Sequence, residues 1–431
     1  MTSPGTTVTF TGGLRTPSGT RFHVSAGGWR AYFDLGLAFA PATSYFDGRI
    51  ERRTDRLLAD LLALGLAPGF PGLYHQSALE GTGLAPGPDG RTAVFISHLH
   101  LDHMGLLPYV ADEVPVYMSA ASAELLIRLE QAGLGSGARR AVEPMPPGEA
   151  VSVGELRVTA MPVDHDIPGA VAFLIDTPDG TLVYSGDLRT HGCRRETTEA
   201  FLLAAAARRP RALVIETSRM GEEPVSMMSE AEVFEELVSV ASQASGLALA
   251  MPYARNLERL SRLPEVAHRA ERRLVVEPAI AHLLATSLPA EVGVYGERVS
   301  GHERVDAAAI ASAPRRYFLQ ISYPRLAELI DLRAPAGSVL VHSDGEPLGP
   351  FDPAHANLLR WLDRFGIAYR VVRSSGHASP SELVRMAAAI APDVIFPLHG
   401  FRPDLLIVPG ARQVLPILDE AYLLDGSPAS E

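Results

Sequence analysis

The sequence predicts a mixed α/β protein in two parts, and three observations lead to this prediction. The first 200 residues alternate short β-rich runs with polar turns, as in TTVTFTGG, TRFHVSAGG and RAYFDLG. From about residue 211, buried strands such as RALVIET and GLALAMP alternate with helical stretches such as EAEVFEELVSVASQA, which favours a parallel sheet covered on both faces. With 431 residues, 47% of them hydrophobic and 20% charged, the chain can fill the cores of two domains.

Further elements follow in order along the chain. Residues 51–66, ERRTDRLLADLLALGL, have apolar positions at helical spacing, and a Pro/Gly-rich loop then runs to about residue 90. TAVFISH is the next predicted strand, ASAELLIRLEQAG the next helix, and GELRVTAMPV, AVAFLIDT and TLVYSGD are three further strands. In the second half RNLERLSRLPEVAHRAERR predicts one helix or two, and RRYFLQIS and GSVLVHS predict strands. SPSELVRMAAAIAP then predicts a helix that precedes the strand and loop of DVIFPLHG.

Composition narrows the classes of function. No apolar run reaches the roughly 20 residues of a membrane span, and MTSPGTTVTF lacks the basic stretch and apolar segment of a signal peptide. We therefore expect a cytoplasmic protein without membrane contact. The one cysteine, Cys193, excludes an internal disulfide and a cysteine-rich zinc site. The net charge of −12 argues against a broad nucleic-acid-coating surface but leaves room for a local basic groove. Because every basic residue is arginine, anion binding must rely on guanidinium groups, backbone N–H groups or metal.

One nonapeptide, SHLHLDHMG at residues 97–105, concentrates side chains that bind metal ions. His98 and His100 lie two apart in extended chain and so point the same way. Asp102 and His103 follow where the chain turns into the next helix, so all four side chains can converge on one pocket. Imidazole and carboxylate groups are the ligands that zinc and related divalent ions prefer. A lone histidine is commonly a capping or core residue, but this spacing between a strand and a glycine turn favours a metal site.

The HxHxDH pattern of these residues is similar to the metal signature of the metallo-β-lactamase superfamily, and other motifs follow in that superfamily's order. FDLG contains Asp34, VDHDIPG contains His165, YSGDLRTHG contains Asp187 and FPLHG contains His399. The resemblance implies an αββα sandwich that binds two divalent metal ions, with Zn²⁺ as the expected metal. It implies one ion held by His98, His100 and His165, a second held by Asp102, His103 and His399, and Asp187 as the bridge between them. Asp34 resembles the first-motif aspartate, which supports the histidine loop without binding the ions.

The chemistry that this resemblance implies is hydrolysis. Two ions about 3.5–4 Å apart lower the pKa of a shared water and stabilise the oxygens of an in-line displacement. The sandwich alone does not choose the substrate, because it hosts lactam, thioester, lactone and phosphodiester cleavage alike.

A long gap between two of the motifs indicates an inserted domain. More than 200 residues separate Asp187 from His399, and the α/β alternation lies in this gap. We predict that residues 1–210 and 373–431 form the sandwich and residues 211–372 the insertion. Three details are similar to the β-CASP family of nucleic-acid nucleases: Glu216 in VIETS resembles its motif A, His377 in RSSGHAS its motif B, and His399 its motif C. MPYARNLERL and SDGEPLGPFD also resemble stretches of that insertion, whereas residues 51–92 are the least family-like part.

The β-CASP resemblance implies catalytic roles for Asp102, Asp187, Glu216 and His377. A histidine in a flexible SGH turn can donate a proton to a leaving oxygen near neutral pH or stabilise its charge. Ser375, Gly376 and His377 are expected to contact the substrate phosphate. Glu216 is expected to accept a hydrogen bond from a ligand histidine. A structural turn histidine and a plain strand-end acid stay open as alternatives for His377 and Glu216.

Other polar residues are less informative. Arg255, Arg259 and Arg262 fall at i, i+4 and i+7 on one face of a predicted helix. One interpretation is a row of arginines that contacts the phosphates of a nucleic acid. Interleaved glutamates favour a solvated face for Arg255, Arg259 and Arg262. His75 and His191 are expected in core or surface roles.

The sequence departs from the ribonuclease J branch of the β-CASP family in three respects. Motif C reads HGF where HGE is expected in that branch. No dedicated 5′-phosphate pocket is recognisable, so the sequence does not support 5′-exonuclease activity. We also do not expect that branch's C-terminal domain.

The sequence therefore predicts a metal-dependent phosphodiesterase in which a hydroxide activated by two zinc ions cleaves nucleic acid. The expected activity is that of a ribonuclease on single-stranded RNA, while DNA as substrate, endo- or exonucleolytic action and a homodimer stay open. A small-molecule hydrolase for an ester, lactone or phosphate ester, with the insertion as a lid, is the alternative. A non-catalytic partner subunit is a third class, and the full set of ligands counts against it.

Overall fold

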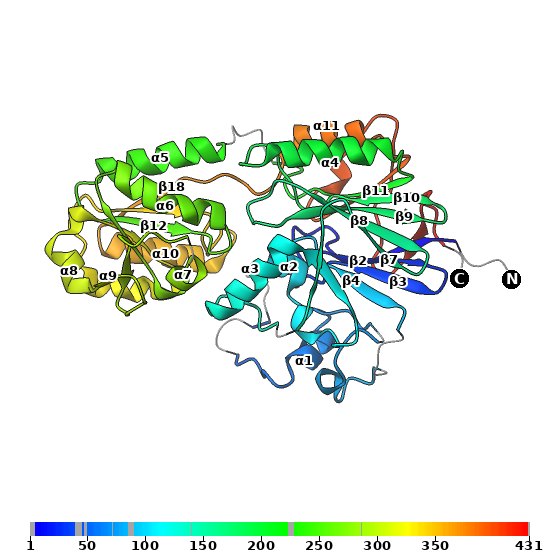
Figure 1. Ribbon diagram of the computed structural model, residues 1–431, viewed down its shortest axis with the longest axis horizontal. Helices are drawn as coiled ribbons and strands as arrows, with labels where there is room; N and C mark the ends of the chain where they lie inside the picture. The colour runs from blue at the N-terminus through cyan, green and yellow to red at the C-terminus, as the bar shows by residue number, and fades with distance from the viewer. Residues whose placement is uncertain are drawn as a thin grey trace.

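The computed structural model describes residues 5–38, 45–46, 50–70, 72–84, 90–138, 140–222, 228–285 and 287–429 (Figure 1). The first four residues of the N-terminal segment and parts of the 51–92 stretch lie outside these ranges. The described strands form three seven-stranded sheets in two lobes, with two sheets facing each other in one lobe and the third sheet in the other. The predicted α/β class is confirmed. No helix in the described ranges is long and apolar enough to cross a bilayer.

The first lobe is a sandwich of two mixed sheets. The first sheet joins, in spatial order, β21 (Ala421–Leu423), β1 (Thr7–Gly12), β2 (Arg21–Ala26), β3 (Trp29–Phe33), β4 (Thr92–Phe95), β5 (Val116–Ser119) and β6 (Glu143–Met145). The second sheet joins β20 (Arg412–Gln413), β19 (Val394–Leu398), β11 (Ala212–Glu216), β10 (Gly180–Tyr184), β9 (Val171–Thr177), β8 (Leu156–Pro162) and β7 (Ala150–Val153).

Aromatic side chains fill the space between these two sheets. The ring centroid of Phe10 lies 5.3 Å from that of Phe396, and Phe22 lies 4.9 Å from Tyr184. Each such buried ring contributes roughly 1.5–3 kcal/mol to folding. The outer face of the first sheet is covered by α1 (Leu57–Ala63) and α3 (Ala120–Gln131), and that of the second by α4 (Arg195–Ala207) and α11 (Pro380–Ile390). The layers therefore follow the predicted αββα order.

The second lobe contains an all-parallel sheet between two layers of helices. Its strands are, in spatial order, β15 (Arg304–Val305), β14 (Gly293–Tyr295), β13 (Arg273–Val276), β16 (Tyr317–Gln320), β12 (Ala248–Pro252), β17 (Val339–Ser343) and β18 (Ala368–Val371). One face packs on α5 (Glu230–Gln243), α6 (Leu257–Arg269) and α7 (Pro278–Leu283), and the other on α8 (Ala307–Ser312), α9 (Leu329–Leu332) and α10 (Pro353–Arg364). β12 and β17 are buried along their whole length, as expected for strands covered on both faces.

Two elements differ from the sequence-based expectation. The helix expected over 51–66 is limited to α1, because Arg56 offers no side-chain cap and only Leu58 and Leu61 are buried. RALVIET was expected at the start of the α/β insertion, but β11 lies in the second sheet, parallel to β10 and β19. The division into 1–210, 211–372 and 373–431 stays a proposal, and we place the start of the insertion after Glu216.

Candidate metal centre

The histidine-rich loop follows β4 at one end of the first sheet. After Ser97 it reaches α2 (Leu101–Met104), a helix of four residues. The ring centroid of His98 lies 4.7 Å from that of His100 and 4.0 Å from that of His103. His98 and His103 are fully buried, whereas His100 is partly exposed. The loop therefore brings its three imidazoles together, as the motif predicts.

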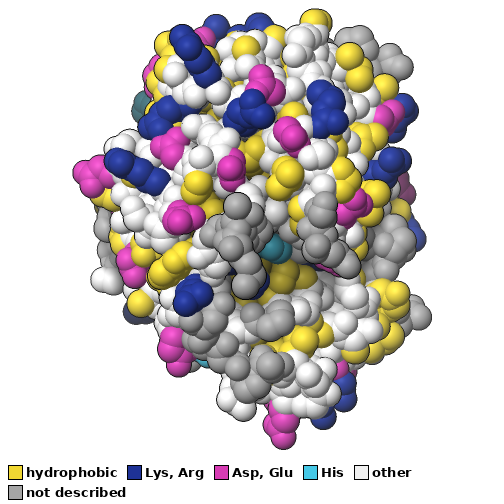
Figure 2. All heavy atoms as spheres, turned by 90° about the vertical axis from the view of Figure 1, so that its right-hand side faces the viewer, with side chains coloured by type: hydrophobic (Ala, Val, Ile, Leu, Met, Phe, Trp, Pro, Cys, Tyr) yellow, Lys and Arg dark blue, Asp and Glu magenta, His cyan; other side chains and the backbone are white. Residues whose placement is uncertain are grey.

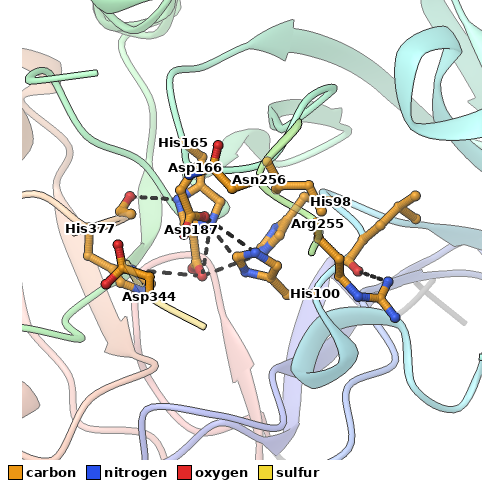
Figure 3. Close-up of polar contacts among 12 residues, drawn as sticks. His98, His100, His165, Asp166, Asp187, Arg255, Asn256, Asp344 and His377 are labelled. Atoms are coloured by element: carbon orange, nitrogen blue, oxygen red, sulfur yellow. Dashed lines mark hydrogen bonds and ion pairs between the residues drawn. The ribbon is translucent and has the colours of Figure 1, made fainter. Parts of the chain in front are cut away.

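Three more predicted ligands come from loops of the second sheet. His165 follows β8, Asp187 follows β10 and His399 follows β19. β8 and β10 run in the same direction because β9 lies antiparallel to both, and β10, β11 and β19 are parallel neighbours. The carboxyl ends of these strands therefore meet at one edge of the sheet, beside the histidine loop (Figure 3).

Asp187 lies at the centre of the cluster. Its Oδ2 atom is 3.1 Å from His103 Nε2, 3.6 Å from His399 Nε2, 3.7 Å from His98 Nε2 and 4.0 Å from His165 Nε2. The ligand atoms of His98, His100, His165 and Asp187 all lie within 4.8 Å of one another, as do those of Asp102, His103 and His399. One carboxylate thus contacts members of both predicted ligand sets, as a bridging role requires.

Unpaired buried atoms test whether this cluster fits metal ions. His98 Nε2 and both carboxylate oxygens of Asp187 are buried and have no hydrogen-bond partner among the described residues. Each unpaired buried polar group costs about 1–3 kcal/mol, so their concentration here is unfavourable unless a ligand pairs them. Imidazole nitrogens and carboxylate oxygens suit divalent transition-metal ions. The residues therefore fit the pair of ions that the motifs imply.

Among the five histidines predicted as metal ligands, four have a hydrogen-bond acceptor at Nδ1, and His100 is the exception. The contacts are His98 to Ser97 Oγ at 3.0 Å, His103 to Asp34 Oδ2 at 2.8 Å, His165 to the Gly376 carbonyl at 2.6 Å and His399 to Ser218 Oγ at 2.6 Å. The Ser97 hydroxyl donates to Asp34 and the Ser218 hydroxyl to the His399 carbonyl, so in each pair we assign the Nδ1–H as the donor. This tautomer leaves the Nε2 lone pair free for an ion.

Asp34 supports the histidine loop from the sheet behind it. Besides His103, it accepts hydrogen bonds from the Ser97 backbone N–H and hydroxyl, both at 2.7 Å, and from the Tyr184 hydroxyl at 2.6 Å. Its backbone is left-handed, with φ of 58°. A non-glycine residue in this region is uncommon and is found mostly for aspartate and asparagine. The residue thus fixes the loop and the orientation of His103 at once.

We expect Asp34→Asn to weaken binding of one ion by about 10–100-fold. The donors of Ser97, His103 and Tyr184 are shared between two carboxylate oxygens in the wild type, whereas the amide of asparagine offers only one acceptor oxygen. Asparagine tolerates the left-handed backbone, so the change tests the hydrogen bonds rather than strain. Competition for Zn²⁺ with a chromophoric chelator measures the affinity. Asp419→Asn is the matched control, because Asp419 is also left-handed, with φ of 62°, and is exposed. Equal affinity of Asp34→Asn and wild type would contradict the supporting role.

Glu216 and His377 meet directly beside Asp187. His377 Nδ1 lies 3.2 Å from Glu216 Oε1 and 3.8 Å from Asp187 Oδ2. Burial disfavours a charged imidazole, but the carboxylates of Glu216 and Asp187 outweigh it and raise the pKa of His377 to about 10. Glu216 was expected to accept a hydrogen bond from a ligand histidine, whereas the histidine that contacts its carboxylate is His377. The carboxylate also accepts hydrogen bonds from the backbone N–H groups of Leu188 and Ser218. The pair therefore places a proton donor at the edge of the metal cluster.

The turn before His377 lies close to the ligands. Ser375 Oγ accepts a hydrogen bond from the His377 backbone N–H at 3.1 Å. A Cβ atom at Gly376 would lie 2.6 Å from Cε1 of His165, so only glycine fits there. Ser375, Gly376 and His377 are thus brought to the cluster, while contact with a substrate phosphate stays a prediction.

The prediction of a solvated arginine face is wrong for Arg255 and Arg259. Arg255 is buried, and its guanidinium donates to the Leu99 carbonyl at 2.8 Å. Arg259 is only 2% exposed and pairs with Glu230 at 2.7 Å and Asp344 at 2.6 Å. The arginines at i and i+4 therefore face the junction of the two lobes instead of solvent.

A buried network, here called the interlobe charge cluster, joins the lobes around Asp164, Arg189, Glu230, Arg259 and Asp344. Arg189 is fully buried and contacts Asp164 at 3.3 Å and Glu230 at 3.1 Å. Its guanidinium also donates to the Ser375 carbonyl at 3.0 Å, so the cluster holds the segment that leads to His377. His191 contacts the same carbonyl through Nε2 at 2.9 Å, and His75 is half-buried near Asp112.

Sequence reasoning missed two residues beside the ligands. Asp166 lies directly after His165, and its Oδ1 is 3.3 Å from both His100 Nε2 and His165 Nε2. Tyr253, from the loop after β12, has its ring centroid 5.4 Å from that of His100. The acid next to His165 in VDHD was a usable signal for the first residue, but nothing local in MPYARN marks the second.

Comparisons with known proteins agree with this fold. The Beta-lactamase superfamily domain matches residues 68–245. The fold, the metal cluster and this match support the classification in the metallo-β-lactamase superfamily.

Ribonuclease J relatives that match most of the chain support the β-CASP classification that the motifs suggest. Ribonuclease J from Mycoplasma genitalium is 23% identical, covering 79% of this chain and 61% of that protein. Ribonuclease J from Pyrococcus abyssi is 26% identical, covering 85% of this chain and 83% of that protein. A crystal structure of a protein of unknown function from Enterococcus faecalis V583 is 29% identical, covers 97% of this chain and 99% of that chain, and has a TM-score of 0.82. The chain spans about three fifths of the Mycoplasma enzyme's length.

Proposed function

We propose that this protein is a metal-dependent phosphodiesterase that cleaves nucleic acid, with single-stranded RNA as its substrate and two zinc ions at the metal centre. The ribonuclease J relatives support a nuclease, and the superfamily domain supports a metal-dependent hydrolase. The observation that carries the proposal is the position of Asp187, whose carboxylate contacts both histidine sets and lies 3.8 Å from His377.

In this proposal the ligand residues would hold the two ions, and His377 would protonate the leaving group of the phosphodiester. Two bound ions would supply an activated water and charge stabilisation for an in-line displacement. His377, anchored by Glu216 through Nδ1, presents its other nitrogen to the substrate side. As the bond from phosphorus to the 3′ oxygen breaks, Nε2–H of His377 donates its proton to that oxygen.

Charge on the surface fits a local contact with nucleic acid better than a broad one. The face shown in Figure 2 carries arginines interspersed with acidic side chains, without a continuous basic patch. Substrate binding then depends mainly on the ions and on local contacts, in keeping with the net charge of −12. DNA as a second substrate, a homodimer and a cytoplasmic location remain parts of the proposal that await their own tests.

We expect His377→Ala to lower cleavage of a 5′-labelled single-stranded RNA by about 10²–10⁴-fold, with both metal ions retained. The reason is that the 3′ oxygen of RNA is a poor leaving group that needs a proton. A p-nitrophenyl phosphodiester has a good leaving group, so the same variant is expected to lose far less activity on it. His75→Ala, a change at a half-buried histidine near Asp112, is the control expected to match wild type.

The result also separates the proposal from its main alternative. Equal losses on both substrates would contradict a proton-donating role for His377. No RNA cleavage by wild-type protein carrying two ions, together with hydrolysis of short esters, lactones or phosphate esters, would favour a small-molecule hydrolase.

A further inference from the structure

His100 is the exception among the five predicted ligand histidines. The other four donate an Nδ1–H to an acceptor behind them and keep Nε2 for an ion. His100 Nδ1 faces His165 Nε2 at 3.3 Å instead. Its Nε2 is buried and has no hydrogen-bond partner among the described residues.

The distance between these two nitrogens fits neighbouring ligands of one ion. With Zn–N bonds of about 2.0–2.1 Å in a tetrahedral site, two ligand nitrogens lie roughly 3.3 Å apart. His100 Nδ1 and His165 Nε2 have this separation. The two nitrogens of an imidazole point away from each other. An ion bound at Nδ1 therefore leaves the Nε2–H directed away from the ion and in need of a hydrogen-bond acceptor.

Asp166 lies at the place where that acceptor is needed. Its Oδ1 atom is 3.3 Å from His100 Nε2, is buried, and also has no hydrogen-bond partner among the described residues (Figure 3). The turn above holds the carboxylate in place, since a Cβ atom at Gly376 would lie 2.9 Å from Asp166 Cγ. The same Oδ1 atom also lies 3.3 Å from His165 Nε2. Because His165 donates its Nδ1–H to the Gly376 carbonyl and keeps Nε2 for an ion, His100 Nε2 is the nitrogen that can donate to Asp166.

We propose that Asp166 is a positioning residue that accepts the Nε2–H of His100 and so presents His100 Nδ1 to the ion held with His98 and His165. A carboxylate behind a ligand histidine fixes the tautomer and raises the basicity of the ligating nitrogen. This ion would be held by three neutral imidazoles and by Asp187, which it shares with the second ion. Asp166 would add a further negative charge beside it. The inference rests on the proposed pair of ions but not on nucleic acid as the substrate.

The test is zinc affinity and stoichiometry of the full chain, measured by chelator competition and elemental analysis. We expect Asp166→Ala to weaken one of two ions by about 10–100-fold and Asp166→Asn to weaken it less, because the amide oxygen can still accept from His100. Asp344→Asn is the matched control, since it removes a carboxylate that pairs with Arg259 and contacts no ligand histidine among the described residues. It is expected to keep wild-type affinity.

A spectroscopic measurement separates positioning from direct ligation. In cobalt-substituted protein, the Nε2–H of His100 should give a shifted, solvent-exchangeable proton signal that moves or broadens in Asp166→Ala while the visible bands stay in place. Loss of a whole equivalent of metal in Asp166→Asn, or a change in the visible bands, would overturn the proposal in favour of Asp166 as a ligand. Affinity equal to wild type in Asp166→Ala would overturn it as well. A wild type that binds no ion would instead count against the proposed function.

Discussion

Replacing Asp187 with asparagine is expected to reduce RNA cleavage by more than about 10³-fold, equivalent to roughly 4 kcal/mol of transition-state stabilisation. The Oδ2 atom of Asp187 lies within 4.0 Å of Nε2 atoms from both histidine sets, so both proposed ions would depend on its charge. Asparagine keeps the volume of the side chain but removes that charge. We therefore expect the variant to fold and to lose both ions on dialysis, measured by elemental analysis beside kcat/KM.

Asp102→Asn provides the graded comparison. Asp102 lies 3.1 Å from His399 Nε2 and belongs to the second ligand set alone, so the expected result is loss of one ion only. An Asp187 variant that retains two ions and cleaves RNA at the wild-type rate would contradict the bridging role. A variant that loses one ion, like Asp102→Asn, would show that Asp187 serves a single site.

The metal cluster could be predicted because its strongest signal is local in sequence. His98, His100, Asp102 and His103 lie within six residues, and the loop that carries them needs little tertiary information to bring them together. The distant members were found because their motifs follow in the order of the metallo-β-lactamase superfamily, each after a predicted strand. The same resemblance implied the αββα layers, whereas the alternation of strands and helices predicted the α/β class.

Contacts between segments far apart in the chain were beyond sequence reasoning. An arginine pair at i and i+4 beside glutamates has the pattern of a solvated helix face, and only the fold shows that Glu230 and Asp344 converge on Arg259. Strand β11 is apolar up to Glu216 at its end, which suits either lobe, and its partner β19 lies about 180 residues further on. Asp166 lay in a quoted motif, but its role depends on which nitrogen of His100 faces it.

The interlobe charge cluster leads to the second large effect, on stability. Arg259→Leu is expected to lower the free energy of unfolding by about 3–5 kcal/mol, because it leaves buried carboxylates without their cation. Glu230 is 4% exposed and would keep only Arg189, and Asp344 would lose the guanidinium that lies 2.6 Å away. The variant also loses the hydrogen bond from Arg259 to the Ser374 carbonyl at 3.4 Å, which helps to hold the segment leading to His377.

Arg269→Leu is the matched control for this prediction, because it removes an arginine from the same helix. Arg269 forms a two-contact ion pair with Glu235, at 2.7 and 2.8 Å, and thus also links α6 to α5, but both side chains are solvent-exposed. Water and salt screen such a pair, so little change is expected. Urea unfolding of the two variants measures the difference, with m-values checked because two lobes need not unfold as one unit. If both variants lose the same stability, burial adds nothing to the Arg259 contacts. If only Arg259→Leu unfolds at a lower urea concentration, the buried guanidinium of Arg259, which the sequence placed in solvent, stabilises the junction of the two lobes.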